Sequence, residues 1–157
     1  MASWPERGRK AAYHIFKLCL FMVYIAVLFY FLFFWDYFGR TDGNTQMHYN
    51  FVPFREILRY ILRAKILGIK LVAFNLGGNI VGFMPFGFFL PALFAKSVNR
   101  WWKAWIWAIL FSGGVEVLQL LTCVGSCDVD DVILNSTGAE CGYILYRLRD
   151  YMRRSNA

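Results

Sequence analysis

Carboxylate and amide side chains occur as closely spaced pairs in three otherwise apolar segments of this sequence. The members of a pair are three or four residues apart, so each pair shares one face of a helix. The pairs are Asn75 with Asn79, Glu116 with Gln119, and Asp131 with Asn135. Two carboxylates that converge where water is scarce can raise each other's pKa, share a proton or hold a cation. The spacing predicts either a functional site or a hydrogen-bonded network that holds helices together.

The third pair follows an acidic opening, DVDDVILN, at residues 128–135. Acids at a helix N-terminus stabilise the helix by about 0.3 to 1 kcal/mol through its macrodipole. Asp128 can also cap the first turn. These structural roles account for Asp128 and Asp130, whereas Asp131 belongs to one of the pairs. We therefore expect Asp131 to be the member of this acidic group that takes part in a site.

The elements that carry these pairs are strongly apolar. Of the 157 residues, 59% are hydrophobic and 20% are aromatic, far above the average of soluble domains. Residues 18–35 contain no charge, lack a small-x-small cleavage site and can cross a hydrocarbon core of about 30 Å. Three more apolar segments follow. The sequence predicts an all-α integral membrane protein with four transmembrane helices, at about residues 18–35, 71–95, 101–121 and 129–146.

Basic residues predict the orientation of these helices. Four lie before the first span, three around the turn between the second and third, and four after the last, whereas the turn at residues 122–128 has none. The positive-inside rule places both termini of this multi-pass protein in the cytoplasm, in the cell membrane. The predicted parts are a basic cytoplasmic N-terminus (1–17), a transmembrane domain (18–146) and a basic cytoplasmic tail (147–157).

In this topology the three polar pairs lie at one depth. At about 1.5 Å of rise per residue, all of them fall in the outer half of the membrane, where polar groups are costly unless they have partners. We therefore expect an outward-opening polar cluster between the second, third and fourth spans. Its members are Asn75, Asn79, Glu116, Gln119, Asp131 and Asn135.

The segment between the first two spans, residues 36–70, carries six basic and three acidic side chains. Within FREILRYILRAKILGIK (54–70), apolar residues recur at helical spacing beside a stripe of Arg55, Arg59 and Arg63. This pattern predicts an amphipathic helix in the membrane interface whose arginines contact lipid or polymer phosphates. The alternative is a solvated charged face on an ordinary connecting helix. The net charge of +7 fits an anionic membrane surface, and no nucleic-acid-binding motif accompanies it.

Prolines and glycines add expectations about packing. Pro85 and Pro91 predict a kink or break in the second span. Two stripes of small residues four apart predict close helix contacts, namely Gly78 with Gly82 and Gly138 with Gly142. Glu140 lies nearly opposite the Asp131 face and could pair with Lys103 or face a partner chain. Cys123 and Cys127 are expected to be free thiols, with a disulfide as the alternative.

Four sequence blocks carry a resemblance to a known family. They are NFVPF (50–54), GNIVGFMPFGFFLP (78–91), VEVLQ (115–119) and GSCDVDDVILNSTGAECGY (125–143). Together, in this order and spacing, they resemble the VanZ family of membrane proteins, which is named after a teicoplanin-resistance protein. By this resemblance, the family's recurrent motif positions are occupied by Asn50, Pro53, Phe54, Asn79, Pro85, Gly87, Glu116, Gln119, Asp128, Asp131, Asn135 and Gly138.

The resemblance implies lowered susceptibility to teicoplanin, a lipid-tailed glycopeptide, without a change in the peptidoglycan precursor. One hypothesis is a non-enzymatic protein whose polar cluster binds the drug, a membrane lipid or a lipid-linked envelope molecule. The other is a membrane-embedded enzyme acting on a lipid-linked or phosphate-bearing envelope substrate, with Glu116 or Asp131 as general base or as ligands of a divalent cation.

The residue types favour the non-enzymatic hypothesis without deciding it. His14 and His48 fall outside the cluster, and no nucleophile elbow, H-E-x-x-H or Walker motif occurs. We expect no metal or other cofactor, although Glu116 and Asp131 offer the oxygen ligands that Mg²⁺ or Ca²⁺ prefers. A transporter would need an oligomer, because four spans leave little room for alternating access.

Overall fold

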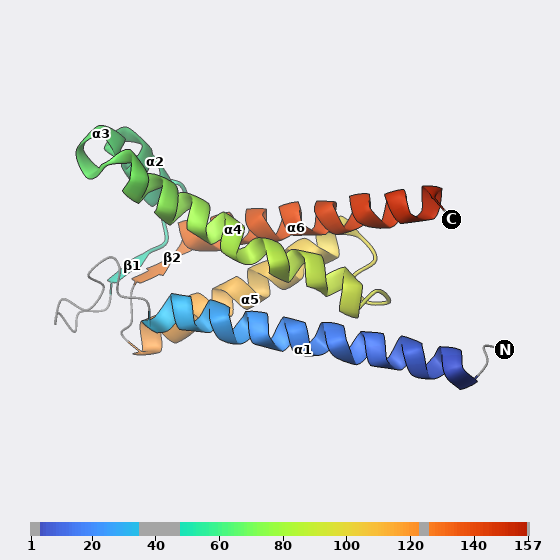
Figure 1. Cartoon of the computed structure of the whole chain (residues 1–157). Helices are drawn as coiled ribbons and strands as arrows, with labels where there is room; N and C mark the ends of the chain where they lie inside the picture. The colour runs from blue at the N-terminus through green and yellow to red at the C-terminus, as the bar shows by residue number, and fades with distance from the viewer. Residues whose placement is uncertain (1–3, 35–47, 123–125, 157) are drawn as a thin grey trace.

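The computed structural model describes residues 4–34, 48–122 and 126–156. Long helices run along the molecule in alternating directions (Figure 1). The start of α1 and the end of α6 lie at one end, and α2, α3 and the strands lie at the other. The elements are α1 (Trp4–Phe34), β1 (His48–Asn50), α2 (Arg55–Leu62), α3 (Ala64–Leu67), α4 (Ile69–Leu93), α5 (Trp101–Thr122), β2 (Ser126–Asp128) and α6 (Val129–Ser155).

Three of the described helices are long and apolar enough to cross a membrane: α1 from Glu6, α4 and α5. The chain is therefore a mainly helical protein with the character of a membrane protein. α6 has 27 residues, but charged residues occupy both of its ends. Four transmembrane spans stay a prediction for this reason. The 31 residues of α1 extend the first predicted span toward the N-terminus, because its basic turns continue the same helix.

Helices α4 and α6 approach each other so closely that only glycine fits at three contact points. A Cβ atom on Gly138 would overlap the carbonyl oxygen of Ile80, and one on Gly142 would overlap that of Met84. Gly87 of α4 meets the backbone of Ala139 in the same way. The predicted close contact of the Gly138 stripe is confirmed.

Two other packing predictions for α4 fare less well. A Cβ on Gly78 would meet open space, and one on Gly82 would make only an ordinary contact with Leu28 of α1, so this pair makes no close helix contact. α4 also runs unbroken through Pro85 and Pro91, so the predicted break is absent and the kink stays a prediction. Helices in apolar surroundings tolerate proline when neighbouring groups satisfy nearby carbonyls. Here the Tyr24 hydroxyl of α1 donates to the carbonyl of Gly82, at 2.8 Å.

The strands form a small parallel sheet that sequence periodicity did not reveal. His48 pairs with Ser126, Tyr49 with Cys127, and Asn50 with Asp128. Each strand has three residues, too few for a recognisable alternation. The sheet places the segment before α2 directly beside the start of α6.

The predicted amphipathic helix is two short helices rather than one. α2 ends before Arg63, and α3 continues to Leu67, after which Gly68 has a φ of 90° and leads into α4. Glycine adopts this left-handed backbone without steric cost. Residues 36–47 of the connecting segment lie outside the described residues, as does Cys123, while Cys127 is a buried free thiol.

Candidate functional site

Asp130 is the most buried of the described carboxylates at the strand end of the molecule, with 1% of its surface exposed. One of its oxygens accepts the backbone N–H of Phe54, and the other accepts those of Glu56 at 2.7 Å and Ile57 at 3.2 Å. Phe54 has a φ of 65°, an unusual backbone for a side chain of its size. The backbone at the start of α2 thus directs three N–H groups at this carboxylate.

Asp128, the last residue of β2, connects β1 to the start of α6. Its Oδ1 accepts Asn50 Nδ2 at 3.0 Å and the backbone N–H of Asp130 at 2.9 Å, so it caps α6 as predicted. Asn50 Oδ1 in turn accepts the N–H of Val52 at 3.2 Å. Burial raises the pKa of Asp128, and the donors from Asp130 and Asn50 act in the opposite direction.

Glu116 connects α5 to this assembly. It is 3% exposed, and its Oε2 accepts the backbone N–H of Asp128 at 2.9 Å. The carboxylate therefore accepts a hydrogen bond from a buried backbone amide of β2. This bond gives Glu116 a structural role in addition to any chemical one.

The remaining predicted residues link neighbouring helices. Asn79 of α4 donates to Asp131 of α6. Asn135 Nδ2 donates to Ser112 Oγ of α5 at 2.8 Å. Gln119 Nε2 reaches the carbonyl of Leu32 in α1 at 3.0 Å. The described long helices are thus joined through side-chain bonds.

Asn75 differs from the other members of the predicted cluster. Its Nδ2 bonds the carbonyl of Leu71 in its own helix, at 3.4 Å. Glu140 Oε2 is buried without a hydrogen-bond partner, and its predicted partner Lys103 lies over the ring of Trp102, 5.6 Å from its centroid. In the described ranges no group of three or more His, Cys, Asp or Glu side chains has the arrangement of a metal site.

Sequence reasoning missed the central role of Asp130, together with Ser112. Its position in the sequence predicts only a helix-dipole role for Asp130, because helical spacing compares residues of one helix and says nothing about the amides of another segment. The available signal was that Asn50 to Phe54 and the DVDD stretch belong to separate motif blocks of one family. Blocks that recur together are candidates for contact.

The segment held by Asp130 carries a surface that is both cationic and apolar. Arg55 and Arg63 are exposed, and Arg59 forms an ion pair with Glu56 and lies 5.2 Å from the centroid of the Tyr60 ring. Large apolar side chains of the same region are also exposed: Phe51, Val52, Phe54, Leu58, Ile61, Leu62, Ile66 and Ile69. The bonds to Asp130 fix where this surface begins.

Comparison with known families gives one match. The family model described as VanZ/LLP1 matches residues 21–150. The matched range includes every residue of the hydrogen-bonded network described above. The comparisons with curated proteins and with solved structures each found no match.

Proposed function

This chain belongs to the VanZ/LLP1 family, and on that premise we propose that it is a non-enzymatic multi-pass protein of the cell membrane that engages an amphiphilic envelope molecule. The surface that engages it is the cationic and apolar one on α2 and α3. The molecule is a membrane lipid, a lipid-linked envelope precursor or the lipid-tailed drug teicoplanin. By engaging it, the protein lowers susceptibility to teicoplanin.

The proposed topology has four spans, with α6 as the fourth and both termini in the cytoplasm. The positions of the chain ends support it, because the start of α1 and the end of α6 lie at the same end of the molecule (Figure 1). Basic residues gather at that end, in residues 7–17 and 147–154. α2, α3 and the polar network then face outward.

The observation that carries the proposal is the anchoring of α2 by Asp130. A free amphipathic helix of eight residues is too short to be stable in water. Three bonds to a buried carboxylate hold its first turn against the bundle. The fixed helix can present Arg55 and Arg63 to phosphate or carboxylate groups while its exposed apolar side chains contact a lipid tail.

In this proposal, the polar network holds the surface on α2 and α3 in place and is not a reaction centre. Glu116 and Asp130 accept backbone amides of other segments, and Asp128 accepts the backbone amide of Asp130 and the side-chain amide of Asn50. Carboxylates that make these bonds fix the positions of the segments that donate to them, and so of the surface on α2. The proposal therefore assigns affinity to α2 and rigidity to the network.

Teicoplanin susceptibility tests the proposal in a sensitive host that expresses the protein. We expect resistance from the wild type and its loss in the double variant Arg55→Gln/Arg63→Gln. The matched control, Arg153→Gln/Arg154→Gln, removes the same charge at the other end and should retain resistance. Membrane levels of all three proteins are matched by immunoblot.

Two results would contradict the proposal. The first is wild-type protein that inserts well but confers no resistance. The second is a change in the mass of envelope lipids that depends on Glu116 and disappears in Glu116→Gln, which would indicate the enzyme. Direct binding of teicoplanin to purified protein in nanodiscs, weakened in the Arg55→Gln/Arg63→Gln variant, would separate binding from effects on growth.

A further inference from the structure

An apolar cavity of about 580 Å³ lies between α1, α4 and α5, toward the end that holds the termini. Its volume falls within the range of about 300 to 1,000 Å³ that is typical of ligand sites. Phe86 and Phe111 stack on its wall, with ring centroids 4.5 Å apart. Ser97 is its only polar lining residue among the described ones. The lining therefore suits a hydrocarbon and offers almost nothing to a polar ligand.

The cavity opens sideways, toward where the membrane would be. Several of its lining side chains are about half exposed, among them Met22, Phe94, Trp107 and Leu110. Leu28 is the only buried side chain among those described in α1, so this helix packs loosely along the others. In a bilayer, the medium in contact with such an opening is the lipid tails.

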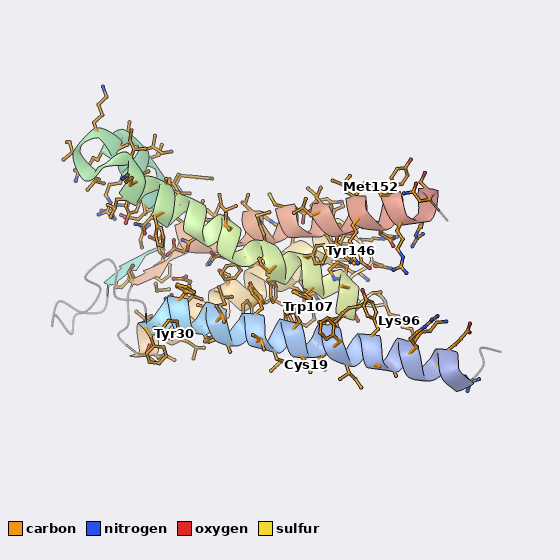
Figure 2. The ribbon with its side chains drawn as sticks, viewed as in Figure 1. Cys19, Tyr30, Lys96, Trp107, Tyr146 and Met152 are labelled. Carbon is orange, nitrogen blue, oxygen red and sulfur yellow. The ribbon has the colours of Figure 1, made fainter. Side chains whose placement is uncertain are left out.

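Cationic side chains lie at the cytoplasmic rim of the cavity. Lys17, one helical turn before the lining residue Phe21, donates to the carbonyl of Ala92 at 3.4 Å. Lys96 is exposed beside Ser97, and Figure 2 shows it closer than Trp107 to the end with the termini. The lining residues and these two lysines all belong to residues 7–34 and 57–115, which contain no aspartate or glutamate.

We propose that this cavity holds one acyl chain of an anionic phospholipid whose phosphate lies between Lys17 and Lys96. The apolar lining, the lateral opening and the two lysines together match the two parts of such a lipid. The proposal is independent of the one for α2, because no residue of α2 or α3 is among the lining residues of the cavity.

Photolabelling of the wild type tests the proposal without any substitution. The protein is reconstituted in vesicles that contain phosphatidylglycerol with a diazirine in one acyl chain, and the labelled residues are mapped by mass spectrometry. We expect label on the segments around Met22 and Trp107 about tenfold above that at Val81 and Ile144, which are exposed but outside the cavity. Uniform labelling would indicate ordinary surrounding lipid and would overturn the proposal.

Filling the cavity gives a second test. Ile25→Trp should reduce the label near Trp107 about tenfold, whereas Val23→Trp, on the same helix but outside the lining, should not. In the wild type, unlabelled phosphatidylglycerol should compete with the diazirine lipid better than phosphatidylcholine does. Lys17→Gln/Lys96→Gln should abolish this headgroup preference, and Lys103→Gln should preserve it. Equal labelling in both tryptophan variants, or no headgroup preference in the wild type, would contradict the assignment.

Discussion

Replacing Asp130 with alanine should release the start of α2 from the bundle. A single N-cap side chain contributes about 0.5 to 2 kcal/mol to a helix. The upper end, about 2 kcal/mol, applies here because the carboxylate accepts three amides and is shielded from water. Since about 1.4 kcal/mol corresponds to a tenfold change in an equilibrium constant, the detachment of α2 should become roughly 30 times more favourable.

Hydrogen–deuterium exchange of the protein in nanodiscs measures this detachment, because the amides of α2 exchange when the helix opens. Exchange across residues 55–62 should accelerate roughly 30-fold in Asp130→Ala, with that of α5 unchanged. Asp130→Asn should be intermediate, because its amide nitrogen cannot accept a hydrogen bond. The control Asp150→Ala removes a carboxylate of α6 that pairs with Arg154, and should leave α2 unaffected. Unchanged exchange of α2 in Asp130→Ala would refute the anchoring role.

Three further predictions concern stability in detergent, measured by thermal unfolding. Gly138→Ala should be less stable than Gly114→Ala by about 1 to 3 kcal/mol, because the first meets the backbone of α4 and the second meets open space; equal melting temperatures would contradict the close contact. Burial raises the pKa of Asp128, so its contribution to stability is greatest below the ordinary aspartate pKa and is lost as pH rises through the raised value. Asp128→Asn should therefore flatten this part of the pH profile, and a profile identical to that of the wild type would argue against it. Glu116→Ala leaves the buried N–H of Asp128 without its acceptor and should cost about 1 to 3 kcal/mol, whereas Glu116→Gln retains an oxygen and should cost less; the order of the two melting temperatures decides.

The helices could be predicted because their signal is local. Composition and charge-free length identify α1, α4 and α5, and spacing identifies the Asn79, Asp131 and Asn135 faces. The predicted bounds of the helices are less accurate than their order, since α1 continues through its basic residues to Trp4. Charge indicates where a helix leaves the apolar phase, but it does not end the helix.

The anchoring of α2 by Asp130 could not be predicted, because it depends on contacts between distant segments. Asp130 and Phe54 are 76 residues apart, and the bond uses a backbone amide that no side-chain pattern marks. The division of the 54–70 segment at Arg63 could not be predicted either, because the helical periodicity of its apolar residues continues across that position.

The glycine contact between α4 and α6 has a consequence for biosynthesis. Ile80 and Gly138 belong to helices that leave the ribosome in a fixed order, with the whole of α5 between them. While α5 is being made, the matching face of α4 meets lipid, and Asn79 has yet to meet Asp131. The bond between Asn79 and Asp131 and the close contact of α4 with α6 therefore form only after α6 has been translated.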